Sequence, residues 1–274
     1  MVVQHNLRAM NSNRQLGLTT AAQSKSTEKL SSGYRVNRAA DDAAGLAISE
    51  KMRRQVKGLT QASRNAQDGI SAVQTAEGAL TEVHDMLQRM NTIANQAANG
   101  TNATADRQYL DQEFKALQSE INRVASTTTF NEKNLLNGSE FGDGVKLQVG
   151  AESGQYITVK ISSMTATSIG VGFSAASITT QDSAQSAITS IKNALASVSS
   201  QRADLGAVQN RLEHTINNLD NVVENTTAAE SQIRDTDMAT EMVAYSNNNI
   251  LAQAGTSMLA QANQANQSVL SILG

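Results

Sequence analysis

A stripe of apolar side chains recurs every three or four residues, without a break, from Met52 to Ala97. This spacing places them along one side of an α-helix, as in the seam of a coiled coil or a long helical bundle. The sequence contains no proline, a residue that costs roughly 3 kcal/mol inside a helix. A single helix from about Asp42 to Ala98 would be roughly 80 Å long. A helix of that length does not fold around one compact core, so the sequence predicts a rod.

Two further stripes predict helices that pack beside the first one. One runs from Leu110 to Val124, after an Asn-Gly turn signal at residues 99–102, and the other runs from Ile188 to Ile233. Helices of this kind bury one another's seams as antiparallel neighbours. The predicted fold class is therefore mainly α: a long antiparallel helical bundle or coiled-coil rod.

A different pattern separates the second and third stripes. Residues 137–180 are rich in glycine, and apolar residues alternate with polar ones over Val145–Val149 and over Ile157–Ile161. Alternation with a period of two on both sides of a Gly-containing connection predicts a small β-hairpin. The Ser- and Thr-rich stretch Ser162–Ser183 is expected to be a loop or a weak strand.

The two ends of the chain share a composition of their own. Residues 1–40 and 235–274 are rich in Asn, Gln, Ser and Ala, with apolar residues at wide spacing. Both segments are compatible with helix, but neither buries enough apolar surface alone to offset the ordering of its backbone. We therefore expect the ends to be disordered in the monomer and helical in an assembly.

The residue content argues against an enzyme, a cofactor or a metal site. There is no cysteine, and the three histidines lie outside any H-E-x-x-H motif. Phosphate-binding and dinucleotide-binding glycine motifs and the G-x-S-x-G motif are also missing from the sequence. The adjacent carboxylates Asp41 and Asp42 are better explained as residues that stabilise the start of the following helix.

Charge and hydropathy exclude two further classes of partner. The net charge is -3 with 17% charged residues, which gives no basic footprint for nucleic acid. No stretch approaches the ~20 apolar residues that span a bilayer. Residues 1–30 are polar and lack the apolar region of a secretory signal peptide. The protein is thus expected to stay in the cytoplasm or to leave by a route that reads another signal.

Several segments, in the right order, resemble bacterial flagellin. The N-terminal signature of that family is matched by Leu30–Ile48, Asn65–Ile70 and Gln74–Leu80. The C-terminal signature is matched by Ala229–Ala239 and Met258–Gln264. The resemblance implies an extracellular subunit that polymerises with copies of itself into the flagellar filament and is exported unfolded by the flagellar type III system.

The resemblance also implies a domain organisation and a set of partners. The expected segments are an N-terminal D0 helix at 1–44, the N-terminal part of the D1 rod at 45–136, a β-hairpin and loop region at 137–184, a C-terminal D1 helix at 185–234 and a C-terminal D0 helix at 235–274. The family pairs the two D0 helices in an inner tube. The expected protein partners are an export chaperone on the C-terminal segment and the filament cap and junction proteins. Some members are also bound by the innate-immune Toll-like receptor for flagellin.

Two sets of site residues follow from this resemblance. The inner-tube assembly contacts are expected at Leu7, Leu30, Ile250, Leu251, Met258, Leu259 and Leu273. The candidate receptor or inter-subunit surface is expected at Gln88, Arg89, Met90, Ile93, Gln96, Leu110 and Glu113. Filament packing is the primary role expected for the second set. Asp85 and Arg89 are four residues apart and are also expected to pair along their helix. Thr92 stands where recognised flagellins usually have Glu, so one charged receptor contact is lost.

Three alternatives stay open at this point. A hook–filament junction protein shares the helical ends but caps a junction and grows no long filament. A secreted monomeric binding module or immune ligand would need a ligand-sized folded surface, and the short hairpin region offers little. A flagellin with an inserted protease domain is disfavoured by the missing H-E-x-x-H motif and the short insert.

Overall fold

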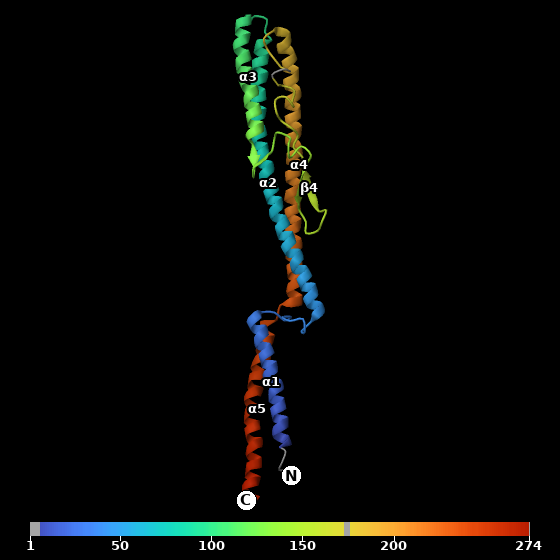
Figure 1. Cartoon of the computed structure of the whole chain (residues 1–274), viewed down its shortest axis with the longest axis vertical. Coiled ribbons are helices and arrows are strands. Elements are labelled where there is room, and N and C mark those ends of the chain that lie inside the picture. Colours follow the sequence, from blue (N-terminus) through green and yellow to red (C-terminus); the bar gives the residue numbers. More distant parts are fainter. Residues whose placement is uncertain (1–5, 173–175, 274) are drawn as a thin grey trace. The chain divides into compact units, whose positions relative to one another are not determined.

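The computed structural model describes residues 6–172 and 176–273, with side chains as far as residue 264. The chain divides into two compact units, residues 57–223 and residues 1–56 with 224–274. The helices and strands shown in Figure 1 have the following bounds: α1 Leu7–Ser32, α2 Ala43–Ala97, α3 Thr104–Thr127, β1 Thr129–Phe130, β2 Lys133–Asn134, β3 Val145–Gln148, β4 Tyr156–Val159, α4 Gln181–Arg234 and α5 Met238–Leu273.

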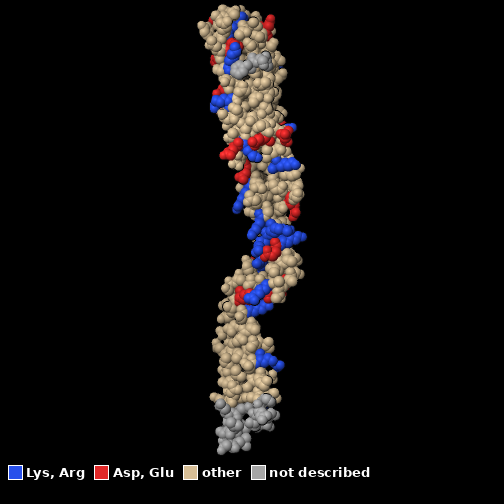
Figure 2. Space-filling model, viewed as in Figure 1, with Lys and Arg blue, Asp and Glu red and all other residues tan. Residues whose placement is uncertain are grey.

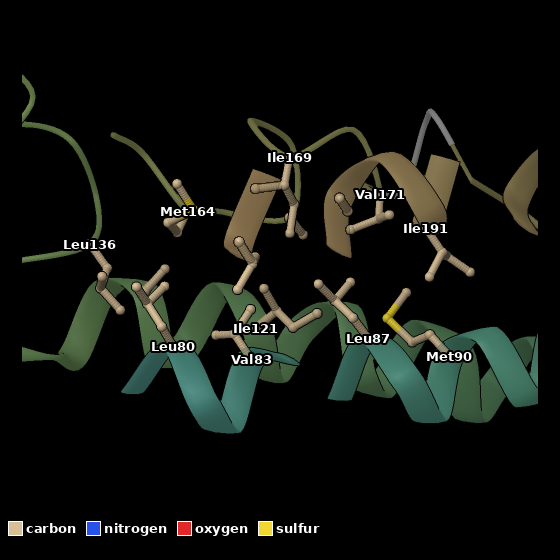
Figure 3. Packing of buried hydrophobic residues seen from close by; sticks show 14 of the residues in the cluster. Leu80, Val83, Leu87, Met90, Ile121, Leu136, Met164, Ile169, Val171 and Ile191 are labelled. Carbon is tan, nitrogen blue, oxygen red and sulfur yellow. The ribbon is translucent and has the colours of Figure 1, made fainter. Parts of the chain in front are cut away.

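The unit of residues 57–223 is built around the seam of α2. The predicted long helix is confirmed, because α2 is unbroken from Ala43 to Ala97. Its apolar stripe meets the stripes of α3 and α4, and the long helices pack antiparallel. Leu87 and Phe114 are completely buried in this core. Figure 3 shows the neighbouring side chains from α2, α3, α4 and the intervening segment that converge on it.

The predicted β-hairpin is confirmed as β3 and β4, which pair antiparallel with Val145 opposite Val159. Two glycines of α2 allow it to lie directly on the helix. A Cβ at Gly69 would come within 2.3 Å of Leu147, and a Cβ at Gly58 within 2.9 Å of Ala151. Gly58 is therefore needed for close packing, whereas a Cβ at Gly69 would push aside the end of the Leu147 side chain.

A second, two-residue ladder of β1 and β2 follows α3 and was not predicted from the sequence. Its turn residues Asn131 and Glu132 have φ values of 48° and 66°. Positive φ at both central residues is the geometry of a tight hairpin turn. The usual signal for such a turn, Asn-Gly or Asp-Gly, is absent here, because Glu occupies the second position.

Four polar side chains hold the irregular segment between β4 and α4. The buried Gln118 Nε2 donates to the carbonyls of Val171, at 2.7 Å, and Ala176, at 3.1 Å. Similar bonds to segment backbone are made by Asp111, Asn122 and Gln201. Backbone polar groups that lack a ladder need such partners when buried. Because its backbone groups have these partners, the irregular segment can place apolar side chains in the core.

The prediction of a loop over Ser162–Ser183 is wrong for its last residues, because α4 begins at Gln181. The hydroxyl of Thr180 accepts the backbone N–H of Ser183 at 3.2 Å, and Ser183 Oγ accepts the N–H of Thr180 at 3.0 Å. This reciprocal cap starts the helix ahead of its apolar stripe.

The other unit contains α1 paired with α5. Asn6 caps α1 by accepting the N–H of Ala9 at 3.0 Å, and its amide donates to the carbonyl of Ala262. At the other end of the pair Lys29 lies 3.4 Å from Glu241. The two helices are therefore antiparallel. Gly33, with φ 76°, ends α1 in the left-handed conformation that favours glycine.

Candidate assembly surface

The α1/α5 pair leaves large apolar side chains exposed. Leu7 is 67% exposed and Ile250 is 61% exposed. The exposed large apolar residues of these two helices are Leu7, Met10, Leu18, Met238, Met242, Val243, Ile250, Leu251 and Met258. So many large apolar side chains exposed on two helices indicate a site of association.

Among its described residues, the α1/α5 pair has no fully buried apolar side chain. The buried side chain on α1 is Ser26, and none of the three apolar core clusters includes a described residue of either helix. The helices approach closely where Gly255 faces Leu16, since a Cβ at Gly255 would lie 3.2 Å from Leu16. An open groove beside this contact is lined from α1 by Asn11–Thr19 and from α5 by Leu251 and Met258. The pair thus has an interface but little core.

Charge is nearly absent from this surface. After Glu241 the sequence contains no Asp, Glu, Lys or Arg, and α1 carries only Arg8 and Arg14 before Lys25. Figure 2 shows few charged side chains over the α1/α5 pair on the face drawn. Burying these helices against a partner therefore desolvates almost no charge, which is the main penalty of a polar interface.

The predicted inner-tube residues divide into three groups. Leu7, Ile250, Leu251 and Met258 are exposed. Leu30 and Leu259 are half-buried in the pair. The side chain of Leu273 lies outside the described residues.

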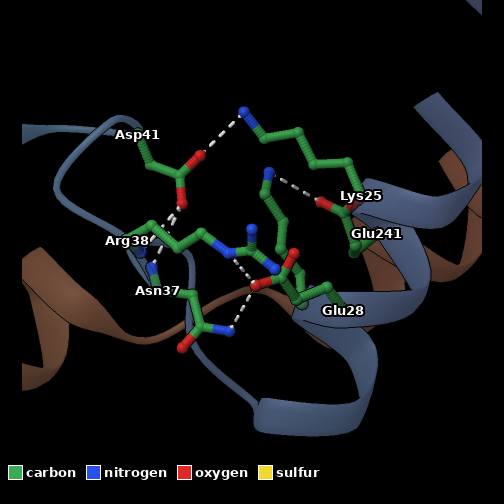
Figure 4. A network of polar contacts seen from close by, with 7 residues as sticks. Lys25, Glu28, Asn37, Arg38, Asp41 and Glu241 are labelled. Atoms are coloured by element: carbon green, nitrogen blue, oxygen red, sulfur yellow. Dashed lines mark hydrogen bonds and ion pairs between the residues drawn. The ribbon is translucent and has the colours of Figure 1, made fainter. Parts of the chain in front are cut away.

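A network of polar contacts fixes the linker that follows α1 (Figure 4). Asp41 pairs with Lys25 at 2.8 Å and accepts the backbone N–H groups of Asn37, at 3.3 Å, and Arg38, at 3.1 Å. Glu28 accepts from the side chains of the same two linker residues. The bond from Lys25 and then the N–H of Arg38 lower the pKa of Asp41 from 3.8 to about 2.

The expectation for the adjacent carboxylates is half right. Asp42 accepts the N–H of Gly45 at 2.8 Å and so stabilises the start of α2. Asp41 instead bonds to the linker and to α1, because the chain turns back between α1 and α2 and brings Lys25 within reach. At the start of α5 the hydroxyl of Thr240, followed by backbone N–H groups, lowers the pKa of the capping Asp237.

The two linkers of this unit are bonded to each other. The N–H of Arg35 donates to the carbonyl of Arg234 at 2.7 Å, and the N–H of Thr236 donates to the carbonyl of Gly33 at 3.0 Å. The Arg234 guanidinium lies 4.5 Å from the centre of the Tyr34 ring and 3.0 Å from a carboxylate oxygen of Glu50. The path of both chain segments between helices is therefore defined by specific contacts.

The second set of predicted residues needs two corrections. Met90 and Ile93 are 0% and 1% exposed, so their side chains belong to the core and not to a surface. The helical period places them on the α2 seam, a signal that was already in the sequence. Arg89 pairs with Glu113 of α3 at 2.7 Å, and not with Asp85 of its own helix.

The rest of that set forms a small polar patch. Gln88, Arg89, Gln96 and Glu113 are exposed, and Leu110 is half-buried against the core. The sequence argument missed Tyr109, which is 70% exposed one helical turn before Glu113. A single exposed aromatic on a polar helix face was the signal available.

The described residues contain no candidate metal centre. Within them, no group of three or more His, Cys, Asp and Glu side chains is placed to hold a metal ion. Among the helices of the described part, none combines the length and apolarity needed to cross a bilayer. A helical subunit with exposed apolar side chains on a nearly uncharged helix pair is a structural protein built for association with other chains.

Comparison with known proteins defines that class further. Residues 3–140 match the bacterial flagellin N-terminal helical region and residues 188–273 match the bacterial flagellin C-terminal helical region. Over the full length of both chains, the sequence is 54% identical to a flagellin of Halalkalibacterium halodurans and 49% identical to a flagellar filament core protein of Treponema maltophilum. It is 47% identical to a flagellin of Bacillus subtilis, again over both full lengths.

A solved structure agrees with these sequence relationships. The crystal structure of Bacillus cereus flagellin is 32% identical, with a TM-score of 0.51, over 57% of this chain and 88% of that one. The chain belongs to the bacterial flagellin family. It is a non-enzymatic subunit that assembles with itself into the extracellular flagellar filament of bacterial motility.

Proposed function

We propose that the α1/α5 pairs of neighbouring copies form the inner tube of the filament by packing their exposed apolar faces together. The observation that carries this proposal is the concentration of exposed apolar side chains on two helices with little core of their own. In this assignment the D0 domain comprises residues 1–44 and 235–274, and the D1 domain comprises 45–136, 137–184 and 185–234.

The energetic argument is coupled ordering and assembly. The α1/α5 pair gains little from its own interior, so the free energy that orders these helices comes from burial against other copies. Apolar burial contributes about 25 cal/mol per Å², and no charge has to be desolvated after Glu241. The same surface is exposed before assembly, which supports export in an unfolded state through the type III system and an export chaperone on the C-terminal segment.

Further partners are proposed from the family and the exposed polar patch. The filament cap and junction proteins would contact the same helical ends. The patch of Gln88, Arg89, Gln96 and Glu113 is the surface available to the Toll-like receptor for flagellin. Because Met90 and Ile93 are buried, receptor contact there rests on polar side chains.

Substitutions at Leu251 test the inner-tube proposal. Leu251→Asp places a charge on the exposed apolar face and should abolish filaments, whereas Leu251→Met keeps the apolar character and should retain them. Filaments are measured by sedimentation and electron microscopy after seeding, and circular dichroism checks that both variants keep the α2–α4 bundle. Filaments of Leu251→Asp at the wild-type critical concentration would overturn the proposal.

A further inference from the structure

The unit of residues 57–223 has an apolar cavity that opens beside the β-hairpin. Its volume is about 200 Å³. Buried or half-buried apolar side chains form its walls, namely Val73, Phe130, Phe141, Leu147, Val159 and Ile161. The polar groups of Asp68, Asn131 and Lys133 complete its lining. A dry cavity of about 150 Å³ takes up a benzene molecule, so this one accommodates an aromatic ring.

Tyr109 is the large side chain that projects most from this unit. It is 70% exposed, the highest value among the exposed large apolar residues of the described chain, and it lies near the start of α3. The cavity lies at the other end of the same helix, where Phe130 and Lys133 pair in the β1–β2 ladder. From Tyr109 to the end of α3 at Thr127 is about 27 Å. Tyr109 therefore does not reach the cavity of its own chain.

We propose that Tyr109 of one copy inserts into this cavity of a second copy. The inference rests on the proposed function, since it names one contact of the same filament. Tyrosine suits the cavity because its ring is apolar and its hydroxyl needs a polar partner, which Asp68, Asn131 and Lys133 provide. Tyrosine is also among the residues that contribute most to protein interfaces.

Charges beside the two elements do not oppose the pairing. The exposed patch next to Tyr109 contains Arg89 and Glu113, which pair with each other at 2.7 Å, and the cavity lining contains Asp68 and Lys133. Each side thus offers one charge of each sign, so the two surfaces meet without net repulsion. Such charges set orientation and register more than affinity.

The geometry of this contact produces an open assembly. The projecting side chain and the cavity are different surfaces of one chain, so the contact is heterologous and leaves one of each free at the two ends. Successive copies would be offset by about the length of the helix between the two elements, on the order of 30 Å. One ring in one cavity is a small interface, so it acts together with the α1/α5 contacts.

Single-cysteine chains test the contact, because the natural sequence has no cysteine. Tyr109→Cys chains and Lys133→Cys chains, distinguished by a tag, are each added as a minor fraction to wild-type chains. The mixture is polymerised and treated with a short bis-maleimide reagent. With one thiol per chain, every cross-link joins two copies. The control replaces Tyr109→Cys with Ser119→Cys, an exposed position about 15 Å further along α3.

We expect the 109–133 heterodimer at least fivefold above the 119–133 control, and only after polymerisation. Equal yields for the two pairs in well-formed filaments would overturn the contact while leaving the inner-tube proposal intact. The inner-tube proposal fails instead if Leu251→Asp chains form filaments at the wild-type critical concentration. The two failures are therefore distinguished, because each is read from a different variant.

Critical concentrations provide a second measurement. Tyr109→Ala should raise the critical concentration about tenfold, which corresponds to about 1.4 kcal/mol. Tyr109→Phe should raise it less than threefold. Ala72→Leu, which fills the cavity from its α2 wall, should match Tyr109→Ala, and the double variant should be no worse than either single one. Additive effects of the two substitutions would contradict insertion.

Discussion

The α2–α3–α4 bundle buries its large apolar side chains, whereas the α1/α5 pair exposes them. In the bundle, Leu80, Leu87, Phe114 and Ile191 are completely buried in one cluster. In the pair, nine large apolar side chains are exposed, among them Leu7 and Ile250. Both regions are long helices without proline, so the difference lies in where apolar residues fall along the sequence.

This difference shows how one chain can contain both helices that pack within the chain and helices left to pack against other copies. A seam with an apolar residue every three or four positions is completed by other helices of the same chain. A sparse pattern on Asn- and Gln-rich helices is not completed within the chain, and copies of the chain are needed to cover it. The sequence thus distinguishes helices whose apolar seam is completed within the chain from helices that, under the proposed inner-tube contact, become ordered by assembly.

Hydrogen exchange should show the largest contrast between the two regions. In the monomer, amides in the centre of α2 and α4 should be protected by the global stability of the bundle, typically about 5–15 kcal/mol. Amides of α1 and α5 should exchange with little protection and slow strongly in the filament. The measurement is exchange followed by mass spectrometry on monomer and filament. Equal protection of α5 and α2 in the monomer would contradict assembly-dependent ordering.

Alanine substitutions in the two regions should have opposite patterns of effect, one on the stability of the monomer and the other on filament assembly. Leu87→Ala leaves a cavity in the bundle and should lower the free energy of unfolding of the monomer by about 2–5 kcal/mol. Leu251→Ala, at an exposed site, should leave that free energy within about 0.5 kcal/mol and should instead raise the critical concentration for filaments. Chemical denaturation and sedimentation measure the two quantities. A destabilised Leu251→Ala monomer would mean that the pair is already folded against a core.

The bundle was predictable from sequence because its signal is a period repeated over many turns. The ends of α2 were predicted from the Asp41-Asp42 pair and the turn signal at residues 99–102, and the β3–β4 hairpin from its period-two alternation. The β1–β2 ladder did not, because its Asn131-Glu132 turn relies on the surrounding structure to hold positive φ. The prediction of the loop before α4 was also wrong at its end, because a hydroxyl cap, and not an apolar residue, starts the helix.

The site residues show where a resemblance and a physical pattern disagree. Met90 and Ile93 were assigned to a surface by resemblance, although their spacing places them in the α2 seam, and the structure buries both. Arg89 was expected to pair with Asp85, but spacing along one helix carries no information about a neighbour such as Glu113. The cavity beside the hairpin depends on long-range packing, so no pattern in the sequence predicts it.

Two glycines of α2 sharpen the comparison on a smaller scale. Gly58→Ala places a Cβ 2.9 Å from the Cβ of Ala151, which has no flexible end to move aside, and should destabilise the bundle by about 1–3 kcal/mol through overpacking. A Cβ at Gly78 meets nothing within 4 Å, so Gly78→Ala should stabilise the same helix by roughly 0.5–1 kcal/mol. Thermal unfolding of the two variants beside wild type measures both signs. A neutral Gly58→Ala variant would show that the hairpin does not rest on α2.

The smallest effect is expected at Asp41, whose ion pair with Lys25 ties the linker to α1. Its pKa is lowered to about 2 from 3.8, so the folded state favours the ionised carboxylate. The stabilisation is complete above the unfolded value and is lost as the pH falls from about 4 through about 2. Asp41→Asn should therefore loosen the linker at neutral pH, with the difference from wild type shrinking across that range.

Backbone exchange of residues 33–42 against pH measures this loss, because the N–H groups of Asn37 and Arg38 are bonded to Asp41. Asp85→Asn, at an exposed position on α2, is the matched control and should follow wild type at every pH. If the linker opened at the same pH in wild type and in Asp41→Asn, the bonds between the two linkers, and not Asp41, would be what orders it. In that case the contacts of Arg35 and Thr236 with the opposite linker would hold the path of the chain without the carboxylate.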